Sequence, residues 1–361
     1  MGVLRFLFAL IVVVEHAGLL FGQNILHSFI AVQSFFLISG FYMALILDKK
    51  YRGDSARKLF WTNRFLRIFP LYWITLALLF SLTLIKFFFH IGNEDNAIVH
   101  YLQWTPDTSP IAFAASIINY IIRNITLIVN ADYFFVIDST PGYLLVQQAW
   151  TLQMELLFYL LVPFLVKLSK KIFFIFFAAY IILFFGIIAH FDLMGHNLLF
   201  NFLQYLYLFL LGMIAYRHIY KVIEHKKISS NILKTVFTSF LLFTLLFNVF
   251  FDGIVKEFFP RIDLLYYGML FITLPFIFAL TKKNNVDGYI GRLSYPMYII
   301  HFLVIKALTN IPSFHDSSDS KTIAAIIITI FISWLALKFI EDPIDAIRQK
   351  RIKRLSLARK K

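Results

Sequence analysis

The sequence predicts an all-α, polytopic helical membrane protein with about ten transmembrane helices and both termini in the cytoplasm. Of its 361 residues, 60% are hydrophobic and only 15% are charged. Soluble domains carry about 25% charged residues, so this composition excludes a soluble globular protein. Uncharged runs of about 17 to 25 residues recur along the chain, and this is the length that a helix needs to cross a bilayer.

The apolar runs define ten expected spans. Placing the N-terminus in the cytoplasm puts 27 of the 34 Lys and Arg residues, Arg5 included, in the inner segments. Both termini are then cytoplasmic, as the positive-inside rule requires. The expected spans lie near residues 4–21, 29–47, 68–90, 144–166, 172–190, 199–216, 235–251, 264–280, 293–309 and 321–340.

One further apolar stretch, residues 111–129, is long enough to span but is not expected to cross. A crossing there would place the basic cluster at 167–171 on the outer side. We therefore expect residues 91–143 to form an outer-face region that lies in the interface or re-enters the membrane. Residues 1–345 then form one membrane domain, and residues 346–361 form a basic cytoplasmic tail.

The basic residues behind the net charge of +14 are expected to set the orientation of the spans in the membrane. The last basic run, Arg348 to Lys361, favours contact with anionic lipid over nucleic acid, so the expected partner is the bilayer. Because the chain has no cysteine, it can form no disulfide, thiolate nucleophile or cysteine metal site. The histidines show no ligand spacing typical of metal sites, so we expect no metal.

Three ionisable residues are expected at one depth within the membrane. With a rise of ~1.5 Å per residue, His16 lies ~16 Å, Glu155 ~18 Å and His301 ~13 Å from the nearest basic residue at the inner face. Glu15 precedes His16. A neutral imidazole beside a carboxylate is a competent general base. The alternative is a set of unrelated buried polar residues that form hydrogen bonds between helices.

Arg64 and Arg67 lie where a basic segment meets the third span. Three residues apart, they project from one helical face at the inner mouth. Two guanidinium groups so placed suit a phosphorylated ligand from the cytoplasm, because arginine binds phosphate oxygens in pairs. Ordinary positive-inside anchoring explains the same spacing, and on spacing alone it is the favoured interpretation.

Several short motifs occur in a family-specific order. They are Arg5-x10-His16, the run Phe35 to Phe41, Arg64-x-x-Arg67-x-x-Pro70-x-Tyr72, the run Trp150 to Glu155, the run Leu293 to Tyr298 leading to His301, and Ile340 to Pro343. With these motifs the chain resembles, over nearly its whole length, the acyltransferase 3 family of bacterial integral-membrane O-acyltransferases. That family includes acetylases of O-antigen and nodulation factors.

The resemblance implies transfer of an acyl group from cytoplasmic acyl-coenzyme A, with acetyl as the default, to a carbohydrate hydroxyl on the outer side. The acceptor would be O-antigen, capsule or another surface glycan, and the protein would lie in the bacterial inner membrane. His16 is implied as the base, Arg5 as its companion, and Arg64 and Arg67 as coenzyme A contacts. Glu155 is implied as a member of the site with an open role.

The sequence leaves alternative functions open. A transporter or flippase for a lipid-linked saccharide would use midplane Glu and His residues to relay protons. A non-catalytic membrane scaffold is a second alternative. Within the enzymatic interpretation, Glu15, Glu155 or His301 orients or charge-balances His16. Direct transfer and transfer through an acyl-histidine are both compatible with these residues.

Overall fold

The computed structural model describes residues 1–23, 25–51, 56–89, 118, 120–127, 144–188, 198–226, 228–251, 261–309, 311 and 318–358. These residues are largely helical, and their only β-contact is an isolated bridge between Leu20 and Gln23. The expected outer-face region, 91–143, therefore lies outside the described residues except for 118 and 120–127.

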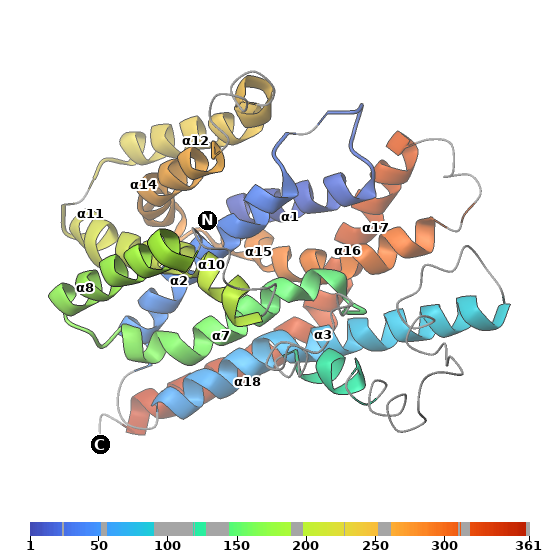
Figure 1. The fold of residues 1–361 in the computed structure, drawn as a ribbon, viewed down its shortest axis with the longest axis horizontal. Coiled ribbons are helices and arrows are strands. Elements are labelled where there is room, and N and C mark those ends of the chain that lie inside the picture. The colour runs from blue at the N-terminus through green and yellow to red at the C-terminus, as the bar shows by residue number, and fades with distance from the viewer. Residues whose placement is uncertain are drawn as a thin grey trace.

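Thirteen α-helices have defined bounds in this part of the chain, residues 120–126 are also helical, and Figure 1 shows the arrangement. They are α1 (Gly2–Ala17), α2 (Ser28–Lys49), α3 (Ala56–Phe89), α7 (Trp150–Leu165), α8 (Lys170–Ile181), α10 (Leu198–Ile214), α11 (Lys221–Lys226), α12 (Ser230–Phe251), α14 (Asp263–Thr281), α15 (Asn285–Arg292), α16 (Ser294–Leu308), α17 (Ser318–Ala336) and α18 (Asp342–Ala358). Turns of π-helix at Ile182–Ile188, Ala215–Tyr220 and Leu337–Glu341 continue α8, α10 and α17, and a 3₁₀ turn, Gln147–Ala149, precedes α7.

Six helical segments within the described residues are long and apolar enough to cross a membrane. They are Ser28–Lys49, Ala56–Lys86, Asn201–Lys226, Ser230–Phe251, Asp263–Thr281 and Asp319–Leu355. Each overlaps one expected span. The other four expected spans overlap α1, α7, α8 and α16, which have 12 to 16 residues each. The expected helical architecture is thus confirmed, with six candidate membrane spans among the described residues, while the count of ten and the side of each terminus stay predictions.

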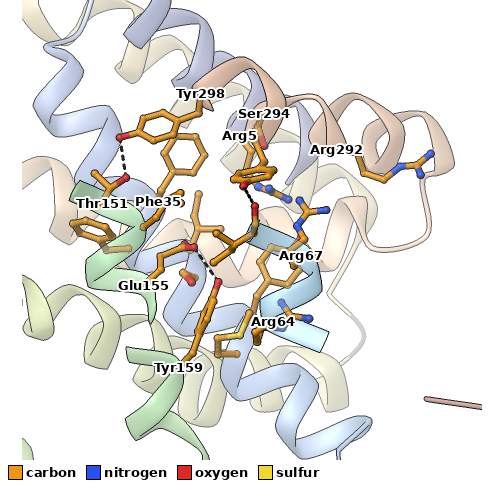
Figure 2. Close-up of a pocket in the computed structure, with 18 of the residues that line it drawn as sticks. Arg5, Phe35, Arg64, Arg67, Thr151, Glu155, Tyr159, Arg292, Ser294 and Tyr298 are labelled. Carbon is orange, nitrogen blue, oxygen red and sulfur yellow. Dashed lines mark hydrogen bonds between the residues drawn. The ribbon is translucent and has the colours of Figure 1, made fainter. Parts of the chain in front are cut away.

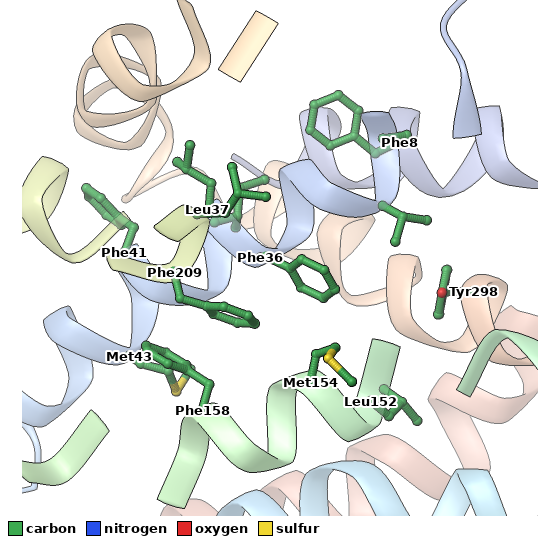
Figure 3. Packing of buried hydrophobic residues seen from close by; sticks show 14 of the residues in the cluster. Phe8, Phe36, Leu37, Phe41, Met43, Leu152, Met154, Phe158, Phe209 and Tyr298 are labelled. Carbon is green, nitrogen blue, oxygen red and sulfur yellow. The ribbon is translucent and has the colours of Figure 1, made fainter. Parts of the chain in front are cut away.

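The core forms where α2, α7 and α10 meet. A Cβ atom on Gly40 would lie 2.0 Å from the carbonyl oxygen of Phe209, and one on Gly212 would lie 2.0 Å from that of Leu37. These two glycines therefore let the backbones of α2 and α10 touch, as small residues do between membrane helices. The Phe209 ring stacks on Phe36 and Phe158, with centroids 4.9 and 4.3 Å apart (Figure 3). These ring contacts fix α7 against α2 and α10.

The start of α1 is held by α15. The Asp287 carboxylate accepts hydrogen bonds from the backbone amides of Gly2 and Val3 at 2.7 and 3.0 Å. It thereby satisfies amides that have no partner within the helix. Burial acts to raise the pKa of Asp287, but the hydrogen bonds it accepts at the start of α1 lower that pKa below its ordinary value. This contact fixes the helix that carries Arg5 and His16.

Candidate functional site

A cavity of about 330 Å³ opens among α1, α2, α3, α7, α16 and α18, with Arg292 reaching it from α15. We call it the arginine cavity, because the described residues that line it include more arginines than carboxylates (Figure 2). This excess of positive charge suits an anionic ligand. The charged lining residues are Arg5, Arg64, Arg67, Arg292, Arg348, Glu155 and Asp345.

Arg64 and Arg67 both reach the cavity from α3, as their spacing predicts, but their surroundings differ. Arg67 Nη1 donates a hydrogen bond of 2.9 Å to Glu341, and the guanidinium lies 5.4 Å from the centroid of the Tyr295 ring. Arg64 lies against the rings of Phe60 and Tyr159, and its buried Nε has no hydrogen-bond partner among the described residues. Arg64 is therefore the more available of the two for a ligand.

Glu155 lies on the opposite side of the cavity from Arg64 and Arg67 in Figure 2. It accepts a hydrogen bond of 2.9 Å from the hydroxyl of Tyr159, one helical turn further along α7. It is also close enough to Arg5 and Arg64 to interact with them electrostatically. The structure therefore brings four predicted site residues, Arg5, Arg64, Arg67 and Glu155, to one cavity.

His16 and His301 form a second group, the histidine pair. Their ring centroids lie 5.3 Å apart, and both rings contact Phe302. The Nδ1 atom of His16 lies 2.8 Å from the carbonyl oxygen of Val12, and that of His301 lies 2.8 Å from the carbonyl oxygen of Tyr298. Since a carbonyl only accepts, each neutral ring carries its proton on Nδ1 and presents a basic Nε2.

The two rings differ in their exposure. His301 is fully buried, and its Nε2 has no hydrogen-bond partner among the described residues. His16, in contrast, is exposed. The expected common depth of these two histidines on α1 and α16 is consistent with their ring contact. Their catalytic roles stay predictions.

Tyr298 connects the arginine cavity with the histidine pair. It lines the cavity, and its ring centroid lies 5.9 Å from that of His301. Its hydroxyl donates to the carbonyl oxygen of Gln148 at 3.0 Å and lies 2.9 Å from Oγ1 of Thr151 (Figure 2). Sequence reasoning placed Tyr298 in a motif but gave it no role. Its position three residues before His301, on the same face of α16, is the signal that was available.

Glu15 lies in a different place from His16, because consecutive residues of a helix point about 100° apart. Its carboxylate accepts hydrogen bonds from the backbone amide and hydroxyl of Ser28, at 2.5 and 2.9 Å, and so caps α2. It also lines a second cavity of about 440 Å³, together with the amide side chains of Gln33, Gln204 and Asn248. The structure thus gives Glu15 a structural contact that the sequence did not predict.

Comparison with known proteins relates the chain to a family. A family model described as an acyltransferase domain matches residues 1–338. "Protein 2 in picA locus" of Rhizobium radiobacter is 42% identical over 72 residues, which are 20% of this chain and 38% of that protein. An uncharacterized protein of Aquifex aeolicus is 26% identical over 218 residues, which are 58% of this chain and 93% of that protein.

The chain thus spans well under two thirds of the first of these relatives. No solved structure matches. The family match, in contrast, covers nearly the whole chain, and it includes the helices that carry Arg5, His16, Arg64, Arg67, Glu155 and His301. The chain therefore belongs to the acyltransferase 3 family.

Proposed function

We propose that this membrane acyltransferase transfers an acyl group, acetyl by default, from cytoplasmic acyl-coenzyme A to a hydroxyl of a cell-envelope or exported carbohydrate. The observation that carries the proposal is the relation between the two parts of the site. A cavity rich in arginine reaches Tyr298, the Tyr298 ring contacts His301, and His301 in turn contacts His16, whose Nδ1 lies against a carbonyl so that its Nε2 can act as a base.

The arginine cavity suits the donor. Coenzyme A carries a diphosphate and a ribose phosphate, and arginine binds phosphate oxygens through parallel hydrogen bonds. Arg64 has a buried Nε with no hydrogen-bond partner among the described residues, so a phosphate oxygen would satisfy it. In this arrangement the phosphates bind at the arginines and the thioester arm extends toward Tyr298 and the histidine pair.

His16 is the proposed general base. Its Nε2 takes the proton of the acceptor hydroxyl while that oxygen attacks the thioester carbonyl carbon. The new ester C–O bond forms, the C–S bond breaks, and the leaving thiolate takes the proton from the His16 imidazolium. The hydrogen bond to the Val12 carbonyl holds the tautomer that this step requires. A route through an acyl-histidine uses the same Nε2 as nucleophile.

The test compares two substitutions of His16. Mass spectrometry of surface glycans from wild-type and deletion strains identifies the acylated sugar. We expect His16→Ala and His16→Gln each to abolish acylation of this sugar per unit of folded protein, since glutamine keeps hydrogen bonding but cannot act as a base near neutral pH. Substantial activity in His16→Gln contradicts the proposal, because a transporter or scaffold with a structural histidine would tolerate glutamine.

A further inference from the structure

The C-terminal helix α18 forms part of the wall of the arginine cavity. It lies alongside the first half of α3 (Figure 1), and Arg351 Nη2 donates a hydrogen bond of 2.8 Å to Oγ1 of Thr62 on that helix. The helix runs without a break through residue 345, where the sequence placed the border of a cytoplasmic tail. Its first turns are thus fixed relative to Arg64 and Arg67.

Arg348 is the basic residue of α18 that faces this cavity. Only 7% of its surface is exposed, whereas Lys350 and Arg354 of the same helix are exposed. A residue that anchors the chain to lipid headgroups has to reach them, so its burial argues against an anchoring role. Arg348 instead lines the cavity, where it donates a hydrogen bond of 3.0 Å to Asp345.

The donors of Arg348 are only partly used. Its Nε is buried and has no hydrogen-bond partner among the described residues, as is also true of Arg64 Nε. Arg348 is close enough to Arg64 and Arg67 to interact with them by charge repulsion. Gathering like charges and unsatisfied donors in a buried site is unfavourable, and a bound anion relieves both penalties.

We propose that Arg348 binds a phosphate group of the coenzyme A donor together with Arg64, so that α18 is part of the donor site. This inference rests on the proposed function. It goes beyond the family match, which ends at residue 338, and beyond the expected anchoring role of the tail. The nearby carboxylate of Asp345 holds the guanidinium toward the cavity before the donor arrives.

The test measures binding of two probes to the purified full-length chain in detergent. Coenzyme A carries the phosphates, and pantetheine is the same arm without them. We expect Arg348→Gln to weaken binding of coenzyme A by about ten- to a hundredfold, the loss typical of a charged hydrogen bond, and to leave binding of pantetheine unchanged. Arg354→Gln is the matched control, with the same change of charge on an exposed position of the same helix, and should bind both probes as the wild type does.

Arg348→Lys separates a phosphate contact from a packing role. It preserves the charge, and should recover part of the lost affinity for coenzyme A, since an ammonium group lacks the paired donors of arginine. Unchanged coenzyme A binding in Arg348→Gln overturns the inference, and so does an equal loss for both probes, which would show that Arg348 only shapes the cavity. If the wild-type chain does not bind coenzyme A, the result contradicts the proposed function, because coenzyme A is then not the donor. This outcome is distinguishable from a failure of the inference about Arg348.

Discussion

The arginine cavity draws its five arginines from four helices, α1, α3, α15 and α18, whereas the histidine pair is made by two helices alone. Each histidine is oriented by a carbonyl of its own helix, three or four residues earlier in the chain. The gathering of the five arginines in one cavity, in contrast, depends on how distant segments pack. The protein thus sets the proton-accepting group locally and builds the charge for ligand binding through tertiary structure.

The difference has a kinetic consequence. Interactions made only in the transition state affect kcat, while interactions with the bound donor affect its affinity. If the two regions divide the work in this way, changes in the histidine pair should lower kcat at unchanged donor affinity. Changes to the arginines that bind the donor should weaken donor binding at unchanged kcat. Each prediction below tests one side of this division.

The largest effect is expected from the histidine pair. A general base contributes about 10²- to 10⁴-fold, so His16→Gln should lower kcat by this factor. His301→Gln should lower kcat less, by about tenfold, because His301 is buried and acts on the acceptor only through its contact with His16. Steady-state kinetics with varied donor supply the measurement. A larger loss in His301→Gln than in His16→Gln would reverse the assignment of the base.

The second effect concerns two arginines of one helix. Arg64→Ala should weaken donor binding by about ten- to a hundredfold with little change in folding, because its Nε has no hydrogen-bond partner among the described residues. Arg67→Ala should mainly lower stability, by about 3 kcal/mol, since it leaves the buried Glu341 carboxylate without its partner.

Donor affinity and thermal unfolding in detergent, measured on both variants, distinguish these outcomes. Arg64→Lys should restore donor binding only in part, because lysine lacks the paired donors. Equal effects of the two alanine substitutions on affinity and on stability would mean that the ion pair with Glu341 does not separate the roles of Arg64 and Arg67.

The sequence could predict the features that are set within one helix, and it could not predict those that depend on the packing of distant helices. Composition and charge predict a helical membrane protein, and a depth count along the expected spans places His16 and His301 at one level. Neither depends on knowing which helices are neighbours. Arg292 and Arg348 enter the site only through the packing of α15 and α18, and a basic run at the end of a chain looks the same whether it contacts lipid or closes a cavity.

Glu15 illustrates the limit of a count by depth. Such a count places Glu15 beside His16, but it contains no information on direction around the helix axis. A step of one residue rotates the side chain by about 100°, which takes Glu15 to the start of α2 and to the cavity lined by Gln33, Gln204 and Asn248. The family resemblance implied that both arginines of α3 contact a ligand, but only the folded chain shows that one of them has Glu341 as a partner.

The smallest effect is expected at the boundary between the two regions. Thr151 Oγ1 lies 2.9 Å from the Tyr298 hydroxyl, and the Tyr298 ring lies against His301. Thr151→Val keeps the shape and removes this contact, while Tyr298 keeps its hydrogen bond to Gln148. A net loss of about 0.5 to 1.5 kcal/mol corresponds to a two- to tenfold change, which we expect in kcat and not in donor affinity.

Thr151→Ser is the matched control, because serine keeps the hydroxyl and loses only a methyl group. It should retain nearly the wild-type kcat, since the contact with Tyr298 survives. If Thr151→Ser and Thr151→Val lose activity equally, the methyl group and its packing matter and the hydroxyl does not. If Thr151→Val instead weakens binding of coenzyme A, Tyr298 belongs to the donor site. The functional division between donor binding and proton transfer then falls between Tyr298 and His301, and not between the arginines and Tyr298.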